Sequence, residues 1–180
     1  ASAPLLCFLN VMIFLQDLNN NFFEEKAFFF LKEIFLSDVM SRLFIEQRPY
    51  ANKPILLAKA DQIWRNLGTK EQFLSIMNHP RIGDLQAVQN TKFSQNEQEA
   101  TSSASDTSIR EFAKLNSLYE QRFGFLYLVF ASDKNTEELL HILKCRLSNT
   151  LEDERLIALW EKNNINLFRL NTNIKDVFEC

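Results

Sequence analysis

The sequence contains few residues that form tight turns, with only 3 glycines and 4 prolines among its 180 residues. Hairpins and other tight turns depend on these two residue types, so a chain poor in both has few hairpins. The scarcity argues against a β-sandwich or a β-barrel. Glycine-rich phosphate loops are also excluded, because neither GxGxxG nor GxxxxGK[ST] occurs. We therefore expect a compact helical domain.

Residues that bind metals or form disulfides are scarce as well. The 2 histidines lie far apart, and the 3 cysteines form neither a disulfide framework nor a CxxC metal knuckle. We therefore expect no metal and no disulfide, which fits a reducing, cytoplasmic environment. No nucleophile elbow and no cofactor motif is recognisable. Any chemistry is then expected to be direct acid–base work on a small molecule.

The charge balance and the N-terminal composition limit the possible partners. The net charge is −3, so no basic excess is present to follow a phosphate backbone, and nucleic acid is not an expected partner. The apolar run from Leu5 to Leu15 is too short to span a bilayer. No basic residue precedes it, as a signal peptide would require. We expect residues 1–18 to be a packed or partner-facing segment, with a remnant signal or an interfacial anchor as alternatives.

The hydrophobic pattern predicts an all-α, single-domain bundle of about seven or eight helices over residues 19–172, followed by a tail at 173–180. The helical patterns cover about residues 19–36, a run ending near 47, and then 54–67, 69–78, 109–123, 136–147 and 150–170. Only residues 125–130 (FLYLVF) have a strand-like composition.

Several helix ends are predicted from capping residues. Gly68 is expected to end one helix, and the capping-box pattern from Thr69 to Gln72 is expected to begin the next. A similar pattern begins at Asn135, and Thr150 is expected to begin the last long helix. Another capping box begins at Ser94.

His79 is the first candidate for acid–base chemistry. It lies at a predicted helix end, directly before Pro80, where the negative end of the helix dipole favours a protonated imidazole. Arg81 and Asp84 are near enough in sequence to oppose or favour the protonated form of His79. A lone histidine is more often structural than catalytic, so both interpretations stay open for His79. His141, which lies inside a helix among leucines, is interpreted as structural.

Glu97 also has two interpretations. In the Ser94 capping box its carboxylate would fold back onto a backbone N–H and do no chemistry. A helix N-terminus is equally a place where free N–H groups bind anions, and the amides after Ser94 would then hold a substrate oxygen. The residues alone do not choose between these possibilities.

Six short motifs occur in order along the chain. They are RPY at 48–50, NHPRIG at 78–83, SxxEQ at 94–98, LNxxYxxxFGF at 115–125, RLxN at 146–149 and RL at 169–170. Their order and spacing resemble the 2-oxo-4-hydroxy-4-carboxy-5-ureidoimidazoline (OHCU) decarboxylases of urate breakdown. The resemblance runs from about residue 19 to residue 170, and the second and fourth motifs carry most of it.

The resemblance implies an all-α enzyme without a cofactor that converts OHCU to (S)-allantoin with loss of CO2. His79 matches the catalytic histidine of the family, and Glu97 matches its catalytic glutamate. The matching substrate-contacting positions are Pro80, Ser94, Gln95, Asn96, Gln98, Leu128, Val129, Phe130, Ala131, Ser132 and Arg169. Arg146 also lies in a family motif, which leaves the assignment to Arg169 less secure. The resemblance and the 17 phenylalanines together suggest a homodimer.

One departure from the family pattern keeps alternatives open. The usual FGFPF reads FGFLY here, because Leu126 and Tyr127 replace proline and phenylalanine. A different pocket would suit an acid–base enzyme acting on a related ureide or imidazoline. A further alternative is a helical interaction module without chemistry. In such a module His79, Glu97 and Arg169 would not converge.

Overall fold

The computed structural model describes residues 12–20, 24–80 and 106–176, and within these ranges it contains eight helices and two strands of two residues each. The predicted all-α, single-domain class is confirmed. The helices are α1 (Leu15–Asn19), α2 (Glu24–Phe35), α3 (Asp38–Glu46), α4 (Lys53–Asn66), α5 (Thr69–Met77), α8 (Asp106–Phe123), α9 (Thr136–Arg146) and α10 (Leu151–Asn173). The strands are β1 (Ile13–Phe14) and β2 (Ile174–Lys175).

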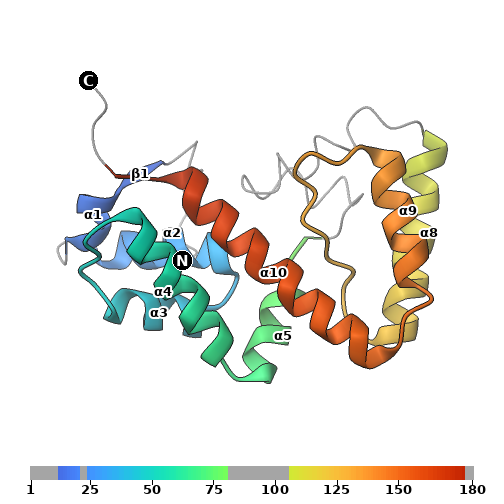
Figure 1. The fold of residues 1–180 in the computed structure, drawn as a ribbon, viewed down its shortest axis with the longest axis horizontal. Coiled ribbons are helices and arrows are strands. Elements are labelled where there is room, and N and C mark those ends of the chain that lie inside the picture. The colour runs from blue at the N-terminus through green and yellow to red at the C-terminus, as the bar shows by residue number, and fades with distance from the viewer. Residues whose placement is uncertain (1–11, 21–23, 81–105, 177–180) are drawn as a thin grey trace, which may run out of the picture.

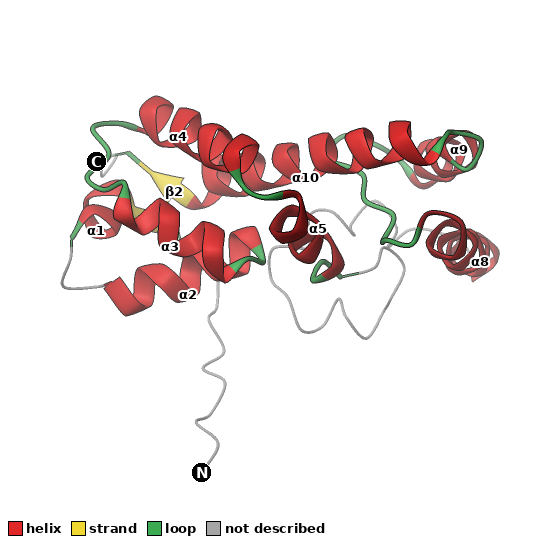
Figure 2. Ribbon diagram, turned by 90° about the horizontal axis from the view of Figure 1, so that it is seen from below, coloured by secondary structure: helices red, strands yellow, loops and turns green. Residues whose placement is uncertain are grey.

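The long helix α10 crosses the middle of the molecule and joins two hydrophobic cores (Figure 1). One core gathers buried side chains of α1 to α4 around the C-terminal end of α10, including Leu170. The other gathers α5, α8, α9 and the segment 125–131 around its N-terminal part, including Ala158 and Ile165. In Figure 2, α5 lies between these two groups, close to α10. Side chains on α5 and α10 are therefore placed where the two cores meet.

The two ends of the described chain pair with each other. Ile13 is in register with Ile174 in a parallel pair, and Leu15 and Leu18 are buried in the first core. The described part of the apolar N-terminal segment is thus packed against the end of α10. No helix among the described residues is long and apolar enough to cross a membrane.

The expected boundary between the third and fourth predicted helices is confirmed to within one residue, but the expected capping box is wrong. The helix α4 ends at Asn66, and Gly68 is the N-cap of α5, which begins at Thr69. Thr69 is already helical and makes no capping box. The reason is a tertiary contact, because the Gln72 amide donates a hydrogen bond to the Trp64 carbonyl at 2.8 Å. That contact uses the side chain that the capping box would need.

Two further expectations need correction. The single helix predicted over 19–36 is wrong at its start, because α1 ends at Asn19 and α2 begins at Glu24. The strand-like run 125–130 forms no strand and joins no sheet among the described residues. Its side chains are instead buried in the second core. The predicted caps at Asn135 and Thr150 are confirmed, the former as a complete capping box.

Candidate active site

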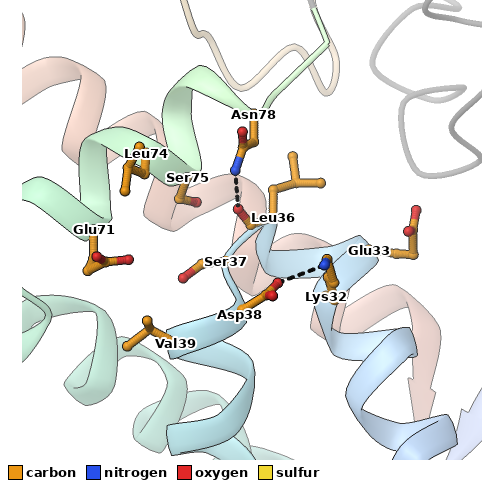
Figure 3. Close-up of a pocket in the computed structure, with 10 residues that line it drawn as sticks. All are labelled: Lys32, Glu33, Leu36, Ser37, Asp38, Val39, Glu71, Leu74, Ser75 and Asn78. Atoms are coloured by element: carbon orange, nitrogen blue, oxygen red, sulfur yellow. Dashed lines mark hydrogen bonds and ion pairs between the residues drawn. The ribbon is translucent and has the colours of Figure 1, made fainter.

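His79 lies just past the C-terminal end of α5 and is buried, with 6% of its surface exposed. Its backbone N–H bonds the Ile76 carbonyl at 3.0 Å, which continues the last turn of the helix. The preceding residue, Asn78, donates its amide to the Leu36 carbonyl at 3.2 Å and so ties this turn to the junction of α2 and α3 (Figure 3). The last turn of α5 and the hydrogen bond from Asn78 to Leu36 therefore hold the histidine in the interior.

The partners of His79 define its protonation state. Its Nε2 lies 3.1 Å from an amino nitrogen of Arg169, and its Nδ1 lies 3.1 Å from the Pro80 carbonyl oxygen. A guanidinium only donates and a carbonyl only accepts. Nδ1 must therefore carry the proton, while Nε2 accepts from Arg169. This is the neutral imidazole with its basic lone pair on Nε2.

The electrostatic surroundings act in the same direction. Burial lowers the pKa of His79 well below 6.5, and the positive charges of Arg169 and Lys162 lower it further, while the hydrogen bond to Pro80 opposes them. The expectation that the helix dipole keeps His79 protonated is therefore wrong. The desolvation of a buried imidazolium and two neighbouring cations outweigh a partial charge at a helix end.

Arg169 comes to His79 from the C-terminal half of α10, 90 residues further along the chain. Its guanidinium is buried and also lies 3.4 Å from the Ile34 carbonyl of α2. His79 and Arg169 thus meet directly, as the resemblance implies. A helical interaction module without chemistry predicts that these residues do not converge, and the contact between His79 and Arg169 contradicts that expectation for this pair.

The same face of α10 carries two more buried polar residues that the sequence analysis did not single out. Lys162 and Asn166 precede Arg169 by seven and three residues, a spacing that places all three on one side of a helix. The Lys162 ammonium donates to the Asn166 side-chain oxygen at 2.7 Å, and both residues are 0% exposed. The spacing itself was the available signal, since polar residues rarely recur on a buried helix face.

The segment Leu128–Ser132 is held against α10 close to these residues. The Phe130 N–H donates to the Glu161 carboxylate at 2.7 Å, and the Phe130 ring packs edge-on against Phe168 with centroids 5.1 Å apart. Glu161 and Phe168 are the immediate neighbours of Lys162 and Arg169. The backbone N–H groups of Val129, Ala131 and Ser132 have no hydrogen-bond partner among the described residues.

Arg146, the competing arginine, belongs to a different cluster. It forms a buried ion pair with Glu154 at 2.9 Å and donates to the Leu128 carbonyl at 2.5 Å. The Tyr119 hydroxyl completes this cluster by donating to Glu154. Arg146 therefore positions the start of the segment 128–132, whereas Arg169 contacts His79.

The remaining predicted residues lie outside the part of the chain that the structure describes. They are Arg81, Asp84, Ser94, Gln95, Asn96, Glu97 and Gln98. Pro80 is described and accepts the His79 hydrogen bond through its carbonyl. Among the described residues, no group of three or more histidine, cysteine, aspartate or glutamate side chains could hold a metal ion.

A separate hollow of about 500 Å³ lies beside this region, where α5 meets the junction of α2 and α3 (Figure 3). Asn78 lines it, together with Glu71 and the Lys32–Asp38 ion pair. His79 and Arg169 do not line it, so this hollow is distinct from their contact.

Comparison with known proteins gives one consistent match. The family model described as OHCU decarboxylase matches residues 20–171. The chain is 28% identical over 172 residues to the 2-oxo-4-hydroxy-4-carboxy-5-ureidoimidazoline decarboxylase of Amia calva, covering 92% of this chain and 95% of that protein. It is 32% identical over 117 residues to the uric acid degradation bifunctional protein TTL of Arabidopsis thaliana, covering 62% of this chain and 36% of that one. The chain thus spans about a third of the length of this bifunctional relative.

Solved structures agree with this match. A crystal structure of an OHCU decarboxylase in the presence of (S)-allantoin superposes with a TM-score of 0.68 at 25% identity, covering 78% of this chain and 94% of that one. A structure of (S)-allantoin synthase, at 18% identity and a TM-score of 0.67, shares the fold. With a family model that spans most of its length, this chain belongs to the OHCU decarboxylase family.

Proposed function

We propose that this protein decarboxylates OHCU to (S)-allantoin, with His79 as the acid–base group. The observation that carries the proposal is the buried contact of His79 Nε2 with Arg169 at 3.1 Å. It joins a neutral imidazole to a guanidinium at the two positions that match the histidine and the late arginine of the family.

The substrate provides much of the chemistry. In OHCU the carboxylate leaves from a carbon that bears a hydroxyl and lies beside a C=N bond. The electron pair of the breaking C–C bond moves into that C=N bond, so the substrate is its own electron sink. The protein has to orient the carboxylate out of the ring plane, stabilise developing charge and supply a proton to one face of the ring.

The described residues suit these tasks. The Nε2 lone pair of His79 can take the substrate hydroxyl proton and return it later, because the imidazole is neutral. Arg169 presently donates to Nε2, and its planar fork suits a substrate carbonyl or carboxylate. When substrate takes the guanidinium, Nε2 is released to act as the base. The N–H groups of Val129, Ala131 and Ser132 would hold ring or ureido oxygens without adding charge.

Glu97 completes the proposal as the match to the catalytic glutamate of the family. A carboxylate near His79 would fix the histidine tautomer or press on the leaving carboxylate by like-charge repulsion. The Pro80 carbonyl already accepts a hydrogen bond from His79 Nδ1–H and so fixes the tautomer, which is the first of these two roles. The second role is therefore the more useful one for Glu97.

The test is the rate of decay of freshly prepared OHCU with wild-type protein and with His79→Asn. Wild type is expected to accelerate the decay without any added metal or cofactor, and His79→Asn is expected to remove at least about 100-fold of that acceleration. His141→Asn is the matched control, because His141 is exposed on α9 and is expected to keep wild-type activity. A wild-type rate equal to the spontaneous rate would reject the proposed function.

A further inference from the structure

Glu161 is a buried carboxylate on α10 that serves a single backbone group. The residue is 9% exposed, and its carboxylate accepts a hydrogen bond from the Phe130 N–H at 2.7 Å. Glu161 makes no other hydrogen bond or ion pair among the described residues. Burying a carboxylate is costly, so one that is kept in the interior has a use for the bond that it makes. The use of Glu161 is therefore to be sought in the peptide group that it holds.

Phe130 is held on its other sides as well. The Lys134 ammonium donates to the Phe130 carbonyl at 2.8 Å, and the Phe130 ring packs edge-on against Phe168 of α10 with centroids 5.1 Å apart. Two residues earlier, the Leu128 carbonyl accepts from the Arg146 guanidinium at 2.5 Å. Charged side chains therefore fix three backbone polar groups of this short segment.

The planarity of the peptide bond carries this orientation to the neighbouring residues. In a trans peptide, the C=O of one residue and the N–H of the next point in opposite directions. The peptide bonds of this segment are trans. Arg146 holds the carbonyl that precedes Val129, so the Val129 N–H points away from Arg146. Lys134 holds the carbonyl that precedes Ala131, so the Ala131 N–H points away from Lys134.

These two N–H groups are the donors that stay available for a ligand. Val129 and Ala131 are each 2% exposed, and neither N–H has a hydrogen-bond partner among the described residues. Buried N–H groups without a partner are rare in native proteins. The segment lies on α10 between Glu161 and Phe168, and Phe168 directly precedes Arg169. Two neutral donors at this place suit carbonyl oxygens of a ligand that the Arg169 guanidinium also binds.

We propose that Glu161 and Lys134 are positioning residues, which hold Phe130 so that the N–H groups on either side of it bind carbonyl oxygens of the substrate. Glu161 ties the segment to α10, the helix that also carries Arg169, whereas Lys134 sets the orientation of the Ala131 N–H. The proposal rests on the proposed function, because OHCU supplies the carbonyl oxygens. The ring and ureido carbonyls are still present in (S)-allantoin, so loss of either side chain should weaken binding of the product as well.

Calorimetric titration with (S)-allantoin tests the positioning without catalytic turnover. Glu161→Leu removes the acceptor of the Phe130 N–H and should weaken allantoin binding by about tenfold. Glu161→Gln keeps an oxygen acceptor and should bind within about threefold of wild type. Lys134→Met should weaken binding by at least about threefold. Its matched control is Lys144→Met, because Lys144 is exposed on α9 in a surface ion pair with Glu111.

The steady-state kinetics of OHCU decay separate positioning from a loss of folded protein. The oxygens to be held are the same before and after CO2 leaves. Glu161→Leu should therefore raise KM by about tenfold and change kcat by less than about threefold. A variant that has merely lost part of its folded population would lower kcat at an unchanged KM.

Amide NMR spectra identify the donors directly. When (S)-allantoin is added to wild type, the Val129 and Ala131 amide resonances should shift more than that of Phe130, which Glu161 already holds. If Glu161→Leu does not fold, Lys134→Met and its control decide the question. Equal affinities of the Leu and Gln variants, a Lys134→Met affinity equal to that of its control, or no allantoin binding by wild type would overturn the proposal. Allantoin binding through these amides without accelerated OHCU decay would support the positioning role and reject the proposed function.

Discussion

At the residue scale, the neutral state of His79 predicts how stability responds to acid. Its pKa in the folded protein lies well below 6.5, while the unfolded chain has the ordinary value. Between these two values the unfolded state binds more protons, so the free energy of unfolding falls as the pH decreases below about 6.5. The slope from this one group reaches about 1.4 kcal/mol per pH unit. His79→Asn should reduce that slope in urea titrations between pH 4 and 7. An unchanged slope would show that folding does not lower the pKa of His79.

The same state predicts the pH profile of the reaction. Because the base form of His79 already predominates at neutral pH, kcat/KM should be flat from about pH 6.5 to 8 and decrease only at lower pH. Initial rates of OHCU decay over this range provide the test, after correction for the spontaneous rate at each pH. A decrease centred on pH 7 or above would contradict the lowered pKa of His79.

Tyr127, one of the two departures from the family pattern, is predicted to affect packing only slightly. Its hydroxyl is buried without a hydrogen-bond partner among the described residues, and its ring lies beneath the Arg146 guanidinium at 4.8 Å. Tyr127→Phe keeps the ring and removes the unsatisfied hydroxyl. It should leave the free energy of unfolding unchanged or raise it by up to about 1 kcal/mol.

Tyr119→Phe is the control for that change, because the Tyr119 hydroxyl bonds both Glu154 and Arg146. It should cost about 1–2 kcal/mol in the same urea titrations. A loss for Tyr127→Phe as large as this one would show that the Tyr127 hydroxyl is bonded in solution.

At the scale of elements, the start of α10 is tied to α9 by the Arg146–Glu154 pair. Both side chains are buried, so removing one charge leaves the other without compensation. Glu154→Gln should lower the free energy of unfolding by about 3 kcal/mol, measured by urea denaturation. In the exposed Lys144–Glu111 pair, Glu111→Gln should cost less than about 1 kcal/mol. Equal effects of the two substitutions would contradict the structural role given to Arg146.

The helices were predictable where one short-range signal governs them. Asn135 and Thr150 cap α9 and α10 as expected, because their side chains bond backbone groups three residues away. The capping box at Thr69 was mispredicted, since the Gln72 side chain instead bonds the Trp64 carbonyl and so connects two different helices. The β1–β2 pair was missed for a similar reason, because it joins opposite ends of the chain.

The candidate site was likewise predictable from the sequence only in part. His79 and Arg169 were identified from short motifs that resemble a known family, although 90 residues separate them. The neutral state of His79 was missed, because it depends on burial and on cations contributed by α10. Lys162 was not singled out, since it lies in no recognised motif and only its spacing to Arg169 places it on the same helix face.

At the scale of the whole molecule, α10 belongs to both hydrophobic cores, which should make unfolding cooperative. Trp64 reports on the first core, where it is buried and donates to the Leu159 carbonyl of α10 at 3.2 Å. Trp160→Phe would leave Trp64 as the single tryptophan. Its fluorescence and the far-ultraviolet circular dichroism should then lose signal at the same urea concentration. Separate midpoints would show that the two cores unfold independently.

A homodimer stays a prediction that rests on the family resemblance and on the phenylalanine content. Large apolar side chains at the surface are consistent with such an interface, including Phe29 and Trp160, which are 55% and 64% exposed. Light scattering at several protein concentrations would decide it. A monomer mass throughout would contradict the expectation.

The central claim is that this protein directs decarboxylation of OHCU through His79, and the chirality of the product tests it most directly. Spontaneous decay protonates both faces of the ring and yields allantoin without net circular dichroism, whereas an enzyme that delivers the proton to one face yields a chiral product. The circular dichroism of allantoin formed from fresh OHCU should match the pure (S)-enantiomer with wild type and with His141→Asn. It should be near zero with His79→Asn, provided that this variant has a wild-type helical spectrum. Racemic allantoin from wild type, or (S)-allantoin at the wild-type rate from His79→Asn, would contradict the account.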